Sequence, residues 1–452
     1  MVKFLTLGGG SEIGANCYYF NIEGTGIILD CGLHPREKGI KALPDFDLIN
    51  DLPVDFVLIS HAHQDHLSAL PFLIKKFPYL KIYCTPQTRA VAELTLHSSV
   101  SLIRNQLKED NIEVYSHEEV DQLIKFIFYK EYDNQFIING YKHNSTEDIS
   151  CTFLDAGHII GSSAILIEFG DNKILYTGDI CFHNQNLLPK AKINLKGITT
   201  LITETTYGST DTSKFSIKKE QDKFTSAINK YINGNASILI PVFSLGKTQE
   251  MLALLHKLMK SGKIPAVDLF TDGIARKINR IYDYNRYTIN YIDSELKIEN
   301  IPQKRLYQVI HIEKLLKQPC IVLAASGMVL PGTASFKLAQ RWLLQNNAAI
   351  FTVGYMDPES PGSFIANAKT GGKIHLTPTS PEIEVKCSIE KFRFPSHALR
   401  ELLLQFISDI SPVNIILTHG DESAQDYIGH KLLTRLPNVK LYAAEKGKEI
   451  SL

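Results

Sequence analysis

The chain has 452 residues, of which 44% are hydrophobic and 21% are charged. Its 48 Lys and Arg equal its 48 Asp and Glu, so the formal net charge is zero. This balance argues against a surface that binds polyanions everywhere, but it permits a focused nucleic-acid site. No apolar run approaches the roughly 20 residues that span a bilayer, and "MVKFLTLGGG" reaches glycines too early for a signal peptide, so we expect a cytoplasmic protein without membrane contact. Seven scattered cysteines without a CxxC pair argue against a disulfide framework and favour buried thiols.

The first part of the chain predicts two strand-rich groups flanked by helices. Apolar runs bounded by glycine predict strands in "KFLTLGGG", "NCYYFNIE", "GIILDCG" and "DFVLISH". Helices are expected from about 65 to 76 and from 86 to 106. Strands resume in "FIFYK", "QFIING", "SCTFLDAGH", "SAILIEFGD", "KILYTGD" and "TTLITETTY". This order predicts sheets packed face to face with helices outside.

The pattern of elements changes near Gly208 and again near Gly371. Between these points, helices such as "KTQEMLALLHKLMK" alternate with strands such as "CIVLAASG", which predicts a parallel sheet in a domain of its own. After Gly371, strand-like sequence, a helix from about Ala398 and the strand "VNIILTHG" resemble the first part. We therefore expect an α/β chain whose segments 1–208 and 371–452 build one domain, with 209–370 inserted into it.

Two glycine-rich stretches imitate nucleotide-binding loops. "LGGGSEIG" follows a strand but precedes another strand, so the helix N-terminus that a dinucleotide pyrophosphate needs is missing. "PVFSLGKTQ" has proline where a Walker A loop needs its first glycine. Both nucleotide-binding interpretations are rejected.

The segment "HAHQDH" carries four metal-ligand side chains, His61, His63, Asp65 and His66. In extended chain at a strand end, His61 and His63 project to the same side. The following helical turn brings Asp65 and His66 back on a second side, an arrangement that can serve two adjacent metal ions. Imidazole with carboxylate suits zinc and, less exclusively, manganese or iron.

Further ligands are expected at other strand ends, because one loop cannot complete two sites. His158 follows an apolar strand between glycines, Asp179 ends "ILYTGD", and His419 ends "IILTH". Asp30, in "ILDCG", is better placed to orient a ligand than to bind the metal.

These residues resemble the metallo-β-lactamase fold, whose motifs match "LDCG", "HAHQDH", "DAGH" and "YTGD" in that order. The later sequence resembles the β-CASP nucleases: "TETTYGST" is similar to motif A with Glu204, "FRFPSHALREL" to motif B with His397, and "ILTHGDES" to motif C with His419. The resemblance covers nearly the whole chain. It implies an αββα four-layer sandwich with an inserted β-CASP domain.

The resemblance also implies two-metal hydrolysis of nucleic-acid phosphodiesters, with His397 as general acid held by Glu204. It implies two zinc ions per chain, and manganese is also suited. One ion would be held by His61, His63 and His158, and the other by Asp65, His66 and His419. Asp179 would bridge the two ions.

The histidine of motif C favours RNA, with single strands preferred, and the products expected are 5′-phosphate and 3′-hydroxyl ends. Three alternatives stay open: a nuclease for DNA or both nucleic acids, a small-molecule metallo-hydrolase, and an inactive scaffold paralogue. After the motif B histidine the run is Ala398, Leu399 and Arg400 where family members often have an acidic residue or glycine, which leaves substrate choice open. Specificity could come from protein partners, and a homodimer is compatible with the sequence.

Overall fold

The computed structural model describes residues 2–107, 112–306 and 312–452, and the chain forms two compact units. The first unit comprises Met1–Asn184, Lys190–Ser213 and His397–Leu452. The second unit comprises Gln185–Pro189 and Lys214–Ser396. The segment expected as an insertion, 209–370, therefore lies in the second unit apart from its first residues, and that unit continues to Ser396.

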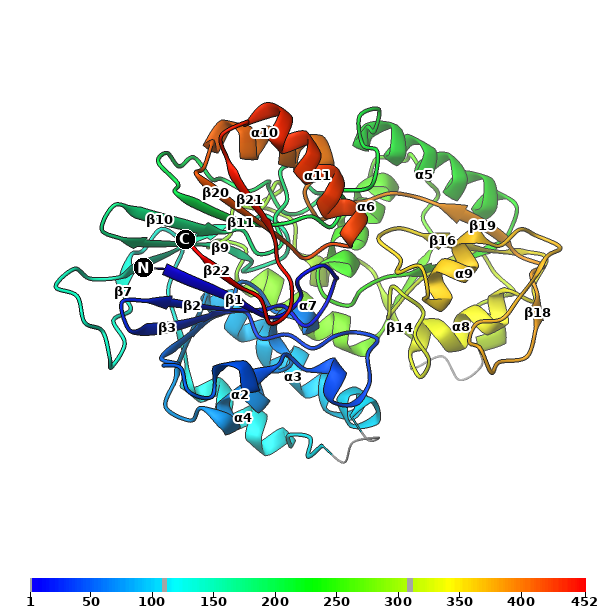
Figure 1. The fold of residues 1–452 in the computed structure, drawn as a ribbon. Coiled ribbons are helices and arrows are strands. Elements are labelled where there is room, and N and C mark those ends of the chain that lie inside the picture. The colour runs from blue at the N-terminus through cyan, green and yellow to red at the C-terminus, as the bar shows by residue number, and fades with distance from the viewer. Residues whose placement is uncertain (1, 108–111, 307–311) are drawn as a thin grey trace. The chain divides into compact units, whose positions relative to one another are not determined.

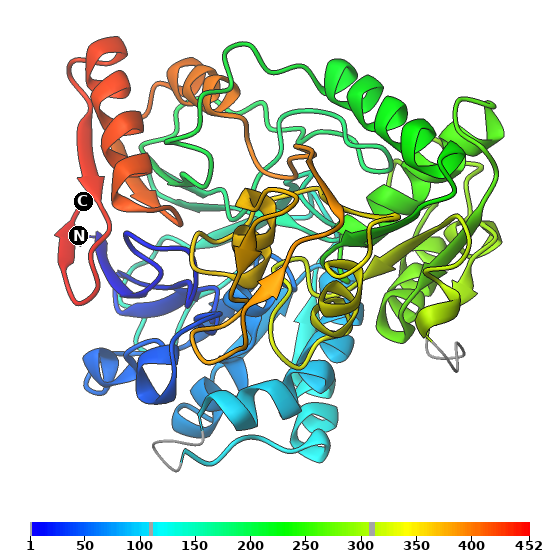
Figure 2. The same ribbon diagram turned by 90° about the vertical axis from the view of Figure 1, so that its right-hand side faces the viewer.

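The first unit contains two seven-stranded sheets. One has the order β22-β1-β2-β3-β4-β5-β6, with β22 Glu449–Ser451, β1 Val2–Gly8, β2 Cys17–Ile22, β3 Thr25–Leu29, β4 Phe56–Leu58, β5 Lys81–Cys84 and β6 Ile127–Tyr129. The other has the order β21-β20-β11-β10-β9-β8-β7, with β21 Lys440–Ala443, β20 Asn414–Thr418, β11 Thr200–Glu204, β10 Asn172–Tyr176, β9 Ser163–Phe169, β8 Ser150–Asp155 and β7 Phe136–Ile137. Both ends of the chain enter the first sheet, where β1 pairs antiparallel with β22, so the termini lie together in Figures 1 and 2.

The two sheets are held by an aromatic and aliphatic core between them. Phe4 and Phe20 from one sheet and Phe153 and Tyr176 from the other are all buried in this cluster. Burial of apolar area on this scale drives the face-to-face packing.

Helices cover the outer faces of both sheets. Those beside the first sheet are α1 Gln64–Leu67, α2 Leu70–Lys76, α3 Pro86–Gln106 and α4 His117–Phe126, and α2 to α4 lie below β1–β3 in Figure 1. Those beside the second sheet are α10 Arg400–Ile410 and α11 Glu422–Arg435, which bury Leu404 and Ile428 against it. The predicted αββα sandwich is confirmed.

The helix predicted from about 65 to 76 is two helices. α1 ends at Leu67 and α2 starts at Leu70, with Pro71 in its first turn. Proline lacks an N–H and is tolerated only in that turn, so a continuous helix through Pro71 is disfavoured. The N–H of Ala69, between the helices, instead donates to the carbonyl of Cys31.

The second unit is built on a six-stranded, all-parallel sheet. Its order is β14-β13-β15-β12-β16-β19, with β14 Lys304–Arg305, β13 Asp268–Thr271, β15 Cys320–Ala324, β12 Ser237–Pro241, β16 Ala348–Thr352 and β19 Ser388–Lys391. Its α-helices are α5 Ile217–Asn233, α6 Lys247–Lys260, α7 Gly273–Tyr284, α8 Ala334–Trp342 and α9 Pro361–Asn367. A separate hairpin pairs β17 Lys373–Ile374 with β18 Ile383–Glu384.

The strand β19 explains why the second unit extends past the expected limit at 370. Its residues pair in parallel with β16, from Ala349 opposite Ser388 to Thr352 opposite Lys391. Strand character alone does not say which sheet a segment joins, because pairing partners come from distant sequence.

Two sequence expectations about the whole chain can be compared with the structure. All seven cysteines are buried and unpaired. Among the described residues, no helix combines the length and apolar character needed to cross a bilayer.

Replacement of Phe153 by alanine should test the packing between the two sheets. Phe153 is fully buried, so Phe153→Ala should lower the free energy of unfolding by about 3–5 kcal/mol through lost burial and a cavity. Phe126→Ala, at a side chain that is 69% exposed in the same unit, should change it by about 0.5 kcal/mol or less. Urea unfolding followed by circular dichroism measures both; equal losses would contradict the assigned core.

Candidate metal centre

The predicted ligands of the first unit lie at strand ends. Strands β10, β11 and β20 are neighbours and run parallel, so Asp179, Glu204 and His419 come together at one edge of their sheet. His158 follows β8 of the same sheet, and His61 to His66 follow β4 of the facing sheet. Side chains from five separate segments thus converge, as polar residues beyond the carboxyl ends of parallel strands commonly do.

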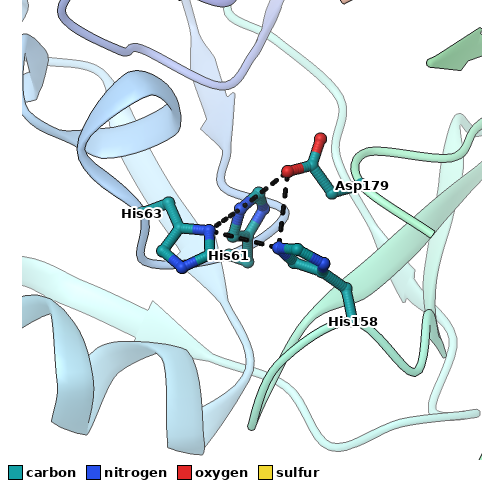
Figure 3. A group of neighbouring side chains, drawn as sticks. All are labelled: His61, His63, His158 and Asp179. Atoms are coloured by element: carbon teal, nitrogen blue, oxygen red, sulfur yellow. Dashed lines mark hydrogen bonds and ion pairs between the residues drawn. The ribbon is translucent and has the colours of Figure 1, made fainter. Parts of the chain in front are cut away.

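The first group of ligands contains His61, His63, His158 and Asp179 (Figure 3). The Nδ1 atom of His63 lies 3.1 Å from Nε2 of His61 and 3.1 Å from Nε2 of His158. Asp179 Oδ2 lies 3.4 Å from each of the same two Nε2 atoms, those of His61 and His158. Four ligands at zinc distances of about 2.0–2.1 Å in a tetrahedron are separated by about 3.3–3.4 Å, so the group fits one zinc ion.

The second group contains Asp65, His66 and His419, and the other oxygen of Asp179 lies close to the last two. Nε2 of His419 lies 3.3 Å from Asp65 Oδ2, and Nε2 of His66 lies 3.8 Å from that oxygen. Asp179 Oδ1 lies 3.3 Å from Nε2 of His66. One buried carboxylate therefore directs one oxygen to each group, the geometry expected of a bridging ligand.

The protonation states suit metal binding in the first group. Burial lowers the pKa of His61 and His158, and burial lowers that of His63 to about 3, so their imidazoles are neutral and have lone pairs to donate. Asp179 Oδ1 is buried and accepts no hydrogen bond from the described residues. Its nearest polar neighbours are two imidazole nitrogens, each 3.3 Å away, and a divalent cation would satisfy this oxygen more fully.

The second group lies in a strongly negative electrostatic environment. Burial opposes a charge on His66, but Asp179, Asp30 and Asp65 outweigh it and raise the pKa of His66 well above its usual value. Burial would raise the pKa of Asp179, yet His419, His66 and His397 hold it well below its usual range. The three carboxylates thus attract positive charge, which a bound metal ion would supply in place of a proton.

Asp30, which the sequence analysis expects to orient a ligand, lies against His66. Its Oδ2 lies 2.7 Å from Nδ1 of His66 and accepts a hydrogen bond from Tyr176 Oη at 2.6 Å. The Ser60 N–H and hydroxyl donate to the two Asp30 oxygens at 2.6 and 2.7 Å. A carboxylate held in this way keeps the proton on Nδ1 and turns Nε2 of His66 toward the metal position.

The backbone at this centre is unusual. Asp30 and His419 are non-glycine residues with positive φ angles of 58° and 45°. Such conformations cost of order 1–3 kcal/mol and cluster at functional sites. Gly32 has no space for a side chain, since a Cβ there would lie 1.7 Å from the carbonyl oxygen of Asp65. Glycine therefore lets the "LDCG" turn pack directly on the ligand loop.

His397 and Glu204 form a pair beside the metal ligands. Nδ1 of His397 lies 3.1 Å from both carboxylate oxygens of Glu204, and 3.9 Å from Asp179 Oδ2. Glu204 is buried and also accepts a hydrogen bond from the N–H of Ile180. Burial alone would lower the pKa of His397, but Glu204 and Asp179 raise it to about 9, which keeps the imidazole protonated at neutral pH.

Three supporting residues were missed by the sequence analysis. Thr206 Oγ1 lies 3.1 Å from Nδ1 of His419, and the Asn16 side chain donates to the carbonyl of Asp65. Tyr176 binds Asp30 as described. Tyr176 and Thr206 lie inside the motifs "YTGD" and "TETTYGST", so adjacency could have indicated them. Nothing in the sequence around Asn16 marks it.

Substitution of Asp30 by asparagine should weaken metal binding while preserving the turn. Asparagine tolerates the positive φ angle of 58° at this position, but it removes the charge that orients His66. We expect zinc affinity to fall about 10–100-fold, measured by chelator competition. Asp148→Asn, at an exposed carboxylate of the same unit, should leave affinity unchanged; an unchanged affinity in Asp30→Asn would show that His66 is oriented without that charge.

Three family models match successive parts of the chain. They are the metallo-beta-lactamase superfamily at residues 10–224, the Beta-Casp domain at 248–365, and the Zn-dependent metallo-hydrolase RNA specificity domain at 382–442. A solved structure of a protein of unknown function from Enterococcus faecalis V583 shares the fold, with a TM-score of 0.56 and 14% identity over the whole of both chains.

Relatives with similar sequences include proteins that are named as nucleases. An RNase J-like protein of Methanocaldococcus jannaschii is 30% identical over 93% of both chains. Cleavage and polyadenylation specificity factor subunit 3 of Dictyostelium discoideum is 25% identical over 100% of this chain but 57% of its own length, and endoribonuclease YSH1 of Saccharomyces cerevisiae is 26% identical over 97% and 57%. The chain thus spans little more than half of these two eukaryotic relatives. On these matches the chain belongs to the β-CASP branch of the metallo-β-lactamase superfamily, a family of metal-dependent hydrolases.

Proposed function

We propose that the chain is a zinc-dependent ribonuclease that hydrolyses RNA with two metal ions and leaves 5′-phosphate and 3′-hydroxyl ends. The observation that carries the proposal is the His397–Glu204 pair, 3.9 Å from the bridging Asp179. Metal ligands alone would suit many hydrolases, but a protonated imidazole beside them is equipped to release an alkoxide leaving group.

The chain's own residues divide the work of the reaction. The two ligand groups would hold the metals and would share Asp179. When bound, zinc lowers the pKa of water toward 7 and neutralises charge on phosphate oxygens. Glu204 holds Nδ1 of His397, which leaves Nε2 to give its proton to the departing ribose oxygen. No ribose 2′-hydroxyl is needed as nucleophile.

RNA is favoured over the alternatives by the third family match and by the relatives. The matched C-terminal segment is described as an RNA specificity domain, and the eukaryotic relatives named above include an endoribonuclease. A small-molecule hydrolase would have no use for the His397–Glu204 pair, and a scaffold paralogue would not need a complete ligand set. Cleavage of DNA, protein partners, a homodimer and the cytoplasmic location stay predictions.

Removal of the general acid should separate catalysis from metal binding. His397→Ala should lower the cleavage rate about 10²–10⁴-fold, with metal content unchanged, because His397 lies outside the two ligand groups as assigned. Elemental analysis and RNA cleavage on the same sample test this, and His430→Ala, an exposed histidine of the same unit, serves as control. Loss of a metal ion from His397→Ala would make His397 a ligand instead.

The ends of the products should report the nucleophile. Single-stranded RNA labelled at the 5′ or 3′ end, incubated with the zinc-loaded protein, should yield 5′-phosphate and 3′-hydroxyl ends. Recovery of 2′,3′-cyclic phosphate would refute direct attack by water. The same strand made of DNA should be cut more slowly; equal rates would indicate the dual-substrate alternative, and exclusive cleavage of thioesters or lactones the small-molecule one.

A further inference from the structure

The second unit has an open pocket of about 620 Å³ between the last turn of α9 and the β17–β18 hairpin. Pockets of roughly 300–1,000 Å³ are typical of small-ligand sites. Phe364, Ala368, Ile374 and Pro378 supply its apolar wall. Ala368 and Ile374 also pack on the hydrophobic core of this unit, so the wall is continuous with that core.

The ionisable side chains that line this pocket are all basic: Lys369, Lys373 and His375. Lys373 pairs with Glu382 at 2.9 Å, whereas Lys369 makes no ion pair with any described carboxylate. Lys391 adds a further ammonium next to the lining, since its Nζ donates to Asn367 Oδ1 at 2.6 Å. Cations around an apolar wall match the charge and surface of a nucleotide, which has an anionic phosphate and a flat base.

Backbone hydrogen bonds hold the basic side of the pocket in place. The N–H of Gly371 donates to the carbonyl of Val385 at 2.7 Å, and the N–H of Val385 donates to the carbonyl of Gly372 at 2.8 Å. The ring of His375 is held by Nδ1, 2.9 Å from the carbonyl of Ser380. The loop that carries Lys369 is therefore formed before any ligand binds.

We infer that this pocket is a binding subsite for single-stranded RNA, in which Phe364 stacks on a base and Lys369 and Lys373 bind phosphates. Proteins that hold single strands combine these two elements, an aromatic platform for bases and cations along the backbone. The inference rests on the proposed function for the class of ligand, but the subsite is separate from the residues that carry out cleavage.

The test measures binding without cleavage, on the full chain stripped of metal, with a fluorescein-labelled single-stranded RNA. Lys369→Ala/Lys373→Ala should weaken binding and flatten the slope of log affinity against log salt by about 0.7–1.4, since each lost phosphate contact contributes about 0.7 for single strands and Glu382 offsets part of the Lys373 charge. Lys257→Ala/Lys260→Ala, at exposed lysines of α6 in the same unit, should match the wild type. Unchanged affinity and slope in the pocket variant would overturn the inference.

Stacking is tested by Phe364→Leu, which keeps an apolar side chain but removes the ring. Affinity should fall about tenfold, within the range measured for loss of a base stack. The fluorescence of Trp342, buried in the core of this unit and the only tryptophan in the chain, checks that the variant is folded. Crosslinking with 4-thiouridine RNA should label residues 361–378; crosslinks confined to other segments would overturn the assignment.

The two proposals fail in different ways. If the zinc-loaded wild type cuts RNA while the pocket variants bind it normally, the subsite is wrong and the ribonuclease stands. If RNA binding depends on Lys369 and Lys373 but the zinc-loaded wild type cuts no RNA, the ribonuclease is wrong and the subsite stands.

Discussion

The carboxylate of Asp179 is the interaction on which the candidate metal centre depends. Its two oxygens face different groups of ligands, Oδ2 toward His61 and His158 and Oδ1 toward His66. A buried carboxylate is stable only when it is paired, and here its neighbours hold its pKa well below the usual range. Removal of this one group would leave two half-sites with no shared ligand.

The parallel strands of the second sheet of the first unit bring the ligands that share Asp179 to one edge. β10, β11 and β20 run parallel, so Asp179, Glu204 and His419 emerge at one edge although they are far apart in sequence. The facing sheet supplies "HAHQDH" after β4 and Asp30 after β3. Gly32 packs closely on the Asp65 carbonyl. The positive φ angles at Asp30 and His419 cost conformational free energy, which the stability of the surrounding sheets offsets.

Hydrogen bonds to carboxylates fix the orientation of two imidazoles at this centre. Asp30 contacts Nδ1 of His66, and Glu204 contacts Nδ1 of His397, so each of these two imidazoles has a carboxylate behind it. The two imidazoles differ in what lies on their other side. The pKa of both imidazoles is raised, but Nε2 of His66 faces Asp179 within the second ligand group, whereas His397 lies beside the two ligand groups. The same type of carboxylate–imidazole pair thus occurs both among the candidate metal ligands and at the proposed general acid.

The sequence by itself determined the kinds of residues and much of the fold. Alternation of short apolar runs with turns predicted the sandwich, and the spacing in "HAHQDH" predicted two sides of a metal site, because side-chain direction in a strand and a helical turn is a local property. Motif resemblance added Glu204 and His397, which no spacing rule would have selected. Only the tertiary structure decided which sheet β19 joins, where the second unit ends, and that Asn16 and Thr206 touch the ligands. Those outcomes depend on contacts between distant segments, and local sequence does not encode which distant partner a strand or a side chain meets.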